Sequence, residues 1–157
     1  MKRFFAISMF LAFALSFALA QNNAVDLHTA AQLHKFGEKL KAEALKSPDG
    51  IAVMNLEKYP GHFTMLTCRT KTGGAEEHAH FSDIFYVVEG DATLMTGGSL
   101  ADAKTISPGE TRGTAVTGGT PHKLSAGEFV HISPNTPHQL VLAPGHHFLY
   151  YVIKVQQ

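Results

Sequence analysis

The chain has 157 residues, of which 45% are hydrophobic and 17% charged, and its 13 basic and 13 acidic residues balance. The basic residues do not cluster, which excludes an extended nucleic-acid surface. Cys68 is the only cysteine, so no disulfide can form within the chain.

Residues 1–20 have the pattern of a secretory signal peptide. A short basic start with Lys2 and Arg3 precedes an apolar stretch at 4–17 and a small-residue cleavage site at 18–20. The apolar stretch is short for a bilayer span of about 20 residues, although an uncleaved anchor is the alternative. Cleavage leaves a chain with 11 basic and 13 acidic residues. We therefore expect an exported protein, periplasmic or extracellular, without a stable membrane anchor after cleavage.

The segment 21–49 is predicted to be helical. Residues 29–32 (Thr-Ala-Ala-Gln) form a capping-box pattern, and 47–50 (Ser-Pro-Asp-Gly) end the helix. Between them, apolar side chains recur three and four residues apart, at Leu33, Phe36, Leu40 and Ala44. These signals predict an amphipathic helix over 29–46.

From residue 50 to 157 the apolar period changes to two, which is typical of strands. The expected strands lie at 51–56, 62–70, 76–80, 83–89, 92–96, 113–117, 128–132, 137–142 and 147–155. Cys68 falls inside the second of them, where a buried structural thiol is expected. Short, evenly spaced strands of this kind favour an all-β sandwich or barrel.

Three residues that can bind a metal stand just before a hydrophobic run. His78 and His80 are two apart on a predicted strand, so their side chains project to the same face. Asp83 follows three residues later, and His138 begins another predicted strand after a turn. Two imidazoles and a carboxylate suit a divalent first-row metal.

These segments resemble the two sequence motifs of the cupin superfamily. The resemblance spans residues 50–155 and rests on Gly73 or Gly74, His78, His80, Asp83 and Gly90 for the first motif, and on Gly127 and His138 for the second. It implies a small jelly-roll β-barrel, preceded here by one helix, with one metal ion held by His78, His80, Asp83 and His138. It also implies a possible homodimer, in which the helix packs across the interface or covers its own barrel.

The chain departs from the family pattern in three places. Asp83 stands where glutamate is commoner, after a loop one residue shorter, so it either binds the metal or caps the turn. The turn at 133–135 (Ser-Pro-Asn) replaces Pro-x-Gly, and Asn135 is expected to adopt the positive φ of the glycine. The segment 91–126 is long, and its part at 99–120 is predicted to form an extra hairpin or a flap.

Three further residues are candidates to line a substrate cavity. Arg112 could hold a substrate carboxylate with two hydrogen bonds, or else be a solvated loop arginine. His131 alternates with Phe129 and is a candidate acid or base. Tyr86 either lines the cavity or fills the barrel core.

The resemblance implies two kinds of function. One is an enzyme of the dioxygenase, isomerase or decarboxylase type that acts on a small organic molecule at one ion of Mn, Fe, Zn, Ni, Co or Cu. The other is a non-catalytic module that binds a small molecule or a metal, since a fold does not fix a function.

Overall fold

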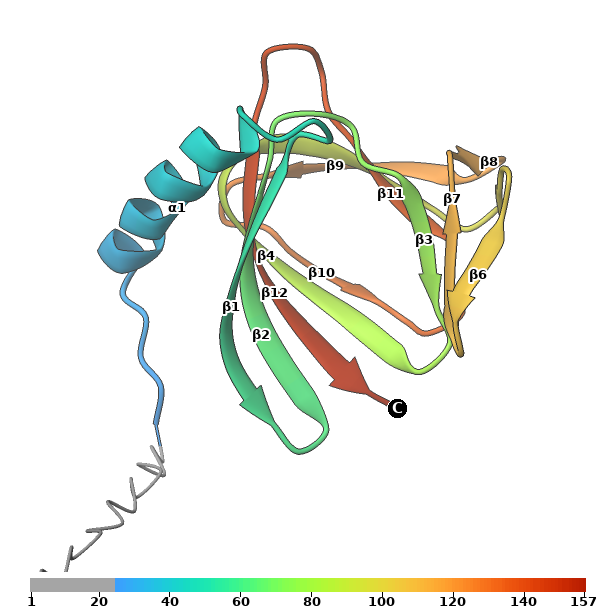
Figure 1. The fold of residues 1–157 in the computed structure, drawn as a ribbon, viewed down its shortest axis with the longest axis horizontal. Helices are drawn as coiled ribbons and strands as arrows, with labels where there is room; N and C mark the ends of the chain where they lie inside the picture. The colour runs from blue at the N-terminus through green and yellow to red at the C-terminus, as the bar shows by residue number, and fades with distance from the viewer. Residues whose placement is uncertain (1–24) are drawn as a thin grey trace, which may run out of the picture.

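The computed structural model describes residues 25–157 (Figure 1). The predicted signal peptide at 1–20 lies outside the described residues. One helix, α1 (Ala30–Ala44), precedes the strands β1 (Ile51–Tyr59), β2 (His62–Arg69), β3 (Ala75–His78), β4 (Phe81–Thr96), β5 (Ser99–Leu100), β6 (Lys104–Ser107), β7 (Glu110–Gly113), β8 (Val116–Thr117), β9 (Thr120–Ser125), β10 (Phe129–Ile132), β11 (His138–Val141) and β12 (Phe148–Gln156).

The strands form an antiparallel sheet that curls into a barrel (Figure 1). Its main path is β1-β2-β12-β4-β11-β3-β7-β6, while β9 and β10 also pair with β4. A separate two-stranded ladder joins β5 to β8. The prediction of an all-β jelly-roll barrel preceded by one helix is confirmed.

The longest strand, β4, holds the two halves of the barrel together. The sequence predicts two strands at 83–89 and 92–96, but the structure has one strand with a bend. Gly90 has φ +83°, and a Cβ atom there would lie 2.0 Å from the carbonyl oxygen of His147, so only glycine fits. On one side of Gly90 the strand pairs with β12 and β10, and on the other with β9 and β11.

Helix α1 covers its own barrel, which is the second of the two expected arrangements. Thr29 caps it with the predicted capping box, because its side chain accepts from the backbone of Gln32. Leu40 is buried against the outer face of β2, beside Leu66 and Cys68. Burying one such leucine stabilises the fold by about 1.5–3 kcal/mol. The predicted burial of Cys68 is confirmed, since its side chain has no exposed surface.

Within the long segment 91–126, the part expected to be a hairpin or a flap (99–120) contains a hairpin that joins the sheet. Strands β6 and β7 pair with each other, and β7 also pairs with β3. In that register Glu110 lies opposite His78, and Arg112 lies opposite Glu76. The hairpin therefore brings two charged side chains to the predicted metal-binding segment.

The turn before β11 confirms the expected role of Asn135. This residue has φ +58°, in the left-handed region where the family motif has glycine. Its backbone N–H donates to the carbonyl oxygen of His78 at 2.8 Å. The turn thus fixes the start of β11 against the end of β3.

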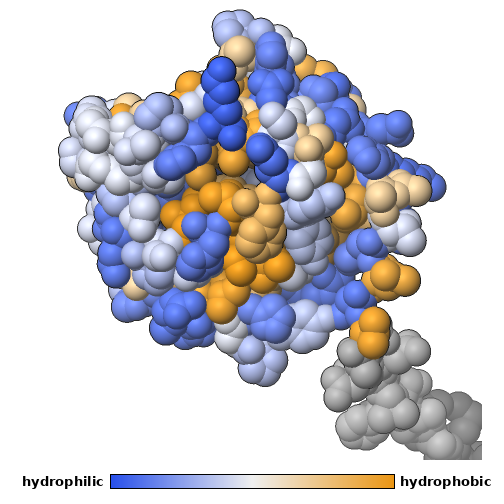
Figure 2. Space-filling model, turned by 180° about the vertical axis from the view of Figure 1, so that it is seen from behind, coloured by the Kyte–Doolittle hydropathy of each residue, from blue (hydrophilic) through white to orange (hydrophobic). Residues whose placement is uncertain are grey.

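The opposite face of the molecule, seen in Figure 2, has apolar surface near its centre with polar side chains around it. Large apolar side chains that stay exposed include Tyr86 and Phe129, which are partners in the pairing of β4 with β10. No helix within residues 25–157 is both long enough and apolar enough to span a bilayer.

Candidate metal centre

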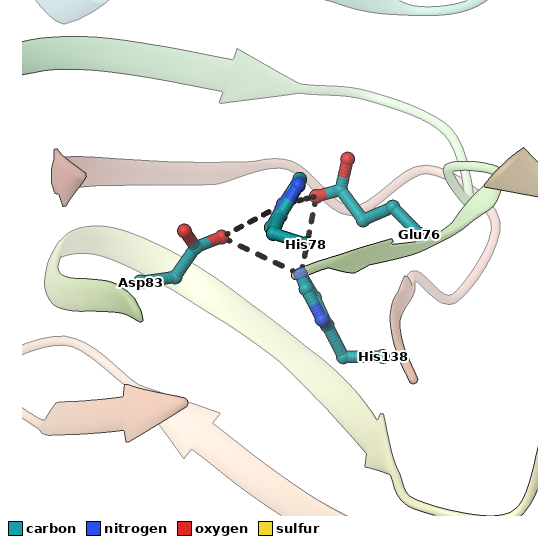
Figure 3. A group of neighbouring side chains, drawn as sticks. All are labelled: Glu76, His78, Asp83 and His138. Atoms are coloured by element: carbon teal, nitrogen blue, oxygen red, sulfur yellow. Dashed lines mark ion pairs between the residues drawn. The ribbon is translucent and has the colours of Figure 1, made fainter. Parts of the chain in front are cut away.

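Four side chains that can bind a metal converge on one point of the barrel (Figure 3). Glu76 and His78 are two residues apart on β3 and so project to the same face. His138, on β11, lies directly opposite Glu76 in the pairing of the two strands. Asp83 reaches the same point from the start of β4. All of them except Glu76 are buried.

The separations between the donor atoms suit one ion. The Asp83 Oδ2 atom lies 3.4 Å from Nε2 of His78 and 3.4 Å from Nε2 of His138. The Glu76 Oε1 atom lies 3.3 Å from Nε2 of His138 and 3.9 Å from Nε2 of His78. Four ligands placed tetrahedrally at about 2.0–2.2 Å from an ion are about 3.3–3.6 Å apart. Three of the four separations fall in this range.

Hydrogen bonds fix both imidazoles in the tautomer that a metal requires, with the proton on Nδ1. Nδ1 of His78 lies 2.7 Å from the Glu110 carboxylate, and Nδ1 of His138 lies 2.9 Å from the carbonyl oxygen of Thr136. These oxygens can only accept, so Nδ1 is the protonated nitrogen and Nε2 carries a lone pair. Nε2 of His138 and Oδ1 of Asp83 are buried without a hydrogen-bond partner within residues 25–157. A bound cation would compensate for such costly unpaired acceptors.

A lysine also reaches the centre. Nζ of Lys154, on β12, lies 2.6 Å from Nε2 of His78 and 2.6 Å from Oδ2 of Asp83. An ammonium group only donates, so it uses the lone pairs that a metal would bind. The Lys154 ammonium and a metal ion therefore compete for the same two atoms.

The surroundings keep Asp83 ionised. Burial opposes its ionisation, but the positive charge of Lys154 and the hydrogen bond that its ammonium donates outweigh burial and hold the pKa of Asp83 well below its usual range. An ionised carboxylate that is only 1% exposed requires a cation beside it.

Of the three predicted cavity residues, Arg112 is the one that lies beside the candidate metal centre. Its guanidinium forms an ion pair with Glu76 and approaches the Glu110 carboxylate at 3.4 Å. Burial, followed by the nearby charge of Arg69, lowers the pKa of Arg112. The positive charge of Arg112 is therefore engaged by acidic side chains of the protein.

His80 lies outside the group. The prediction assumed a strand through residue 80, but β3 ends at His78, so the alternation of side chains stops there. The backbone N–H of Ala79 instead donates to the carbonyl oxygen of Gly109 at 2.8 Å. The exposed His80 ring packs on that turn, because a Cβ atom at Gly109 would lie 2.5 Å from its Cδ2 atom.

The other two predicted cavity residues lie on the outside of the barrel. Tyr86 is 45% exposed and alternates with Phe85 and Val87, which point into the core. His131 pairs with Ile84. Ile84 is two residues from Tyr86 on β4, so its side chain points to the same outer face. His131 does share a face with Phe129, as expected, but it is the outer face.

Two cavities lead to the metal-binding group. The inner one has about 160 Å³ and is lined in part by Glu76, Asp83 and Lys154. The outer one has about 420 Å³. Both are lined by Arg69 and Arg112, so the cavities adjoin at these two arginines. The outer cavity thus gives a path to the candidate metal centre.

Sequence reasoning missed Glu76, Glu110 and Lys154. A strand that ends at His78 places Glu76, not His80, on the same face as His78. Lys154 follows Tyr150 and Val152 at every second position of β12, which is a signal for an inward-facing charge. Glu110 reaches His78 only through the pairing of β7 with β3, and no local pattern shows that pairing.

Comparisons with known proteins find likeness in structure alone. No protein-family model matches the sequence, and no curated protein sequence matches it. Oxalate oxidase in complex with glycolate aligns with a TM-score of 0.51 and 18% identity, over 70% of this chain and 53% of the oxidase chain. A predicted oxalate decarboxylase from Thermotoga maritima aligns with a TM-score of 0.51 and 9% identity, over 68% of this chain and 81% of the other.

The polyketide cyclase RemF from Streptomyces resistomycificus aligns with a TM-score of 0.48 and 16% identity, over 67% of this chain and 64% of the cyclase. The chain therefore spans just under two thirds of the cyclase and about half of the oxalate oxidase. Together with the topology, the likeness to the oxidase and the decarboxylase establishes a cupin-like barrel fold.

Proposed function

We propose that this protein is a metal-binding, cupin-like enzyme that acts on a small organic molecule at a single divalent ion. The ion would be held by Glu76, His78, Asp83 and His138. One observation carries the proposal: two imidazoles with lone pairs on Nε2 and two carboxylates present four donor atoms within 4.8 Å of one another. Isolated histidines and acids in a barrel wall have no reason to converge in this way, since burying them is costly.

Such an ion would supply Lewis acidity toward a substrate oxygen, or a place for substrate beside O₂. The protein supplies the surroundings. Glu110 and Thr136 fix the two imidazole rings through their Nδ1 atoms. The inner cavity holds the reacting molecule beside the donor atoms, and the buried barrel core excludes bulk water behind it. Dioxygenase, decarboxylase and isomerase chemistry all fit this arrangement.

The structural neighbours support a small substrate. One is an oxalate oxidase with bound glycolate, and another is a predicted oxalate decarboxylase. We extend to this chain only the general inference that its substrate is small.

The alternative is a barrel that binds a small molecule without metal chemistry. The position of Lys154 favours it, because an ammonium group that bridges His78 and Asp83 already provides a cation for the buried carboxylate. In this case the pairing of Asp83 with Lys154 is permanent, and added metals do not bind.

We further propose that the protein works outside the cytoplasm, as the pattern of residues 1–20 indicates. Fractionation of the producing cells, with mass determination of the mature chain, tests this proposal. A mature N-terminus at Gln21 supports export, and a full-length chain in the cytoplasmic fraction contradicts it.

Elemental analysis tests the metal proposal on protein purified without added metal or a histidine tag. We expect close to one ion of Mn, Fe, Zn, Ni, Co or Cu per chain, and none in a variant that carries both His78→Ala and His138→Ala. Protein loaded with the metal found is then assayed on oxygenase, decarboxylase and isomerase substrates. If wild-type protein takes up none of the six metals after incubation, the metal-free barrel is correct.

A further inference from the structure

We propose that Arg69 is the anion-binding group of the inner cavity and that the ligand is a small carboxylate. This ligand class rests on the proposed function, because it names the molecule that would lie beside the candidate metal centre. Arg69 itself contacts none of the four donor side chains by an ion pair or a hydrogen bond.

Arg69 is a partly buried guanidinium that lacks an acidic partner. It ends β2 and lines both cavities. None of the ion pairs formed among residues 25–157 includes it. Its Nε donates to the hydroxyl of Tyr150 at 3.1 Å, while its two terminal nitrogens have no acceptor in this part of the chain. These two nitrogens face the cavities with their donors unused, so the position suits a ligand with a negative charge.

No neighbouring acidic side chain in the described part of the chain forms an ion pair with Arg69. Asp49 lines the outer cavity, but its carboxylate accepts from the hydroxyl of Ser47 and from the backbone of Ile51. Arg112 shares both cavities with Arg69, but its charge is engaged by acidic side chains. Among the described residues, Arg69 is thus the arginine of these cavities whose terminal nitrogens are left for a ligand.

Gly73 fixes the orientation of the Arg69 guanidinium. A Cβ atom at Gly73 would lie 2.5 Å from Nη1 and 2.8 Å from Cζ of Arg69, so the guanidinium packs where any other residue has a side chain. Gly73 itself is held on both sides, since its N–H donates to Leu140 at 3.0 Å and its carbonyl accepts from Gln139 at 2.8 Å. A guanidinium held in this way is prepared to bind a carboxylate with two parallel hydrogen bonds.

The size of the inner cavity limits the ligand. At about 30 Å³ for each water molecule, a volume of about 160 Å³ corresponds to about five waters. This space suits a carboxylate of about two to four carbons. The cavity is also lined by Phe85 and Val152, so the part of the ligand away from the carboxylate would contact apolar side chains.

The test compares each carboxylate with its uncharged amide in metal-free protein. Glycolate and glycolamide, and propionate and propionamide, are titrated at constant ionic strength, and binding is followed by NMR of the backbone amides. We expect both acids to bind at least about tenfold more tightly than their amides, as a pair of charged hydrogen bonds implies. Arg69→Met should lose this preference, and Arg69→Lys should retain part of it.

Two further variants separate a specific role of Arg69 from general effects. Gly73→Ala displaces the guanidinium without changing any charge, so it should weaken acid binding even if Arg69→Met fails to fold. Lys123→Met removes a positive charge from the exposed strand β9 and should bind the acids as the wild type does. Equal affinity for acids and amides, or unchanged acid binding in the folded Arg69→Met variant, would overturn the inference.

Zinc titrations distinguish this inference from the proposed function. Arg69→Met should bind zinc as the wild type does, because Arg69 is not a candidate ligand. If neither zinc nor any of the other five candidate metals binds but acid binding depends on Arg69, the metal proposal fails and the anion site stands. If zinc binds and acids do not, the anion site fails and the metal proposal stands.

Discussion

Replacing Lys154 by methionine should make the protein bind metal more tightly. Methionine keeps the length of the side chain but removes the ammonium that contacts Nε2 of His78 and Oδ2 of Asp83, both at 2.6 Å. In the wild type an ion must displace these two contacts before it can use the same lone pairs. In the variant both lone pairs are available from the start.

The size of the effect follows from these contacts. A hydrogen bond that involves a charged group contributes about 1.5–3 kcal/mol. The Lys154 side chain is only 13% exposed, so solvent does not fully screen them. If metal entry breaks one contact, the cost is about 1.5 kcal/mol, which is about tenfold in the Kd for the metal. If it breaks both, the cost is about 3 kcal/mol, or about a hundredfold. Lys154→Met should therefore bind zinc about ten- to a hundredfold more tightly.

The assay is a zinc titration against a competing chelator, with Lys123→Met as the control for loss of a surface charge. Thermal unfolding gives a second measure. Without metal, Asp83 loses its cation, so the variant should be less stable than the wild type by about 3–5 kcal/mol. Zinc should restore that stability. A variant that binds zinc no more tightly than the wild type would refute the competition between the ammonium and the metal.

Three further predictions concern single side chains. Glu76→Gln should weaken zinc binding by about 10- to 100-fold, whereas His80→Ala should leave it within about twofold, and elemental analysis after dialysis compares them. The folded-state pKa of Asp83 is lowered, so its ionised form stabilises the protein above the unfolded value of 3.8, and this stability is lost as the pH falls below it. In metal-free protein, Asp83→Asn should therefore flatten the decline of urea stability between about pH 5 and about pH 2; an unchanged slope would contradict this. Burial raises the pKa of the Cys68 thiol to about 11, so a thiol reagent at pH 8 should modify it only on unfolding; rapid reaction of the folded protein would contradict this.

The sequence is a good guide to features that depend on near neighbours. The capping box at Thr29 and the positive φ of Asn135 both follow from the chemistry of a few adjacent residues, and both are present. The change from helical to strand periodicity near residue 50 also matches the structure. These features need no information about distant parts of the chain.

Features that depend on strand pairing are less predictable. The expected pair of His78 and His80 required a strand that continues to residue 80, but the β6–β7 hairpin binds the backbone at Ala79 and ends β3 there. The same hairpin supplies Glu110. No short sequence pattern shows that a segment some thirty residues away will pair with β3.

The alternation of side chains along a strand does identify charged residues that face the barrel interior. Arg69 follows Met65 and Thr67 at every second position of β2, and all three line the inner cavity. On β12, Lys154 is likewise two residues after Val152, and both line the inner cavity. In this chain the two inward-facing charges lie beside the candidate metal centre, whereas His80, near a turn, does not.

The ligand set narrows the choice of metal. A group with His80 would have three imidazoles, whereas the observed group has two imidazoles and two carboxylates. Imidazole suits Zn, Cu, Fe and Ni, and carboxylate oxygens suit harder ions such as Mn. If the proposed ion is bound, a balanced set of nitrogen and oxygen donors is compatible with Mn, Fe or Zn.

The charges around the candidate metal centre couple the binding of a metal to the binding of an anion near Arg69. Three carboxylates, Glu76, Asp83 and Glu110, are matched by the cations Arg69, Arg112 and Lys154, so the cavity is neutral while the histidines are neutral. A divalent ion adds two positive charges to this small, mostly buried volume. A ligand with one carboxylate would offset one of them, so metal and carboxylate should bind with positive coupling. By thermodynamic linkage the metal must then strengthen carboxylate binding by the same factor by which the carboxylate strengthens metal binding.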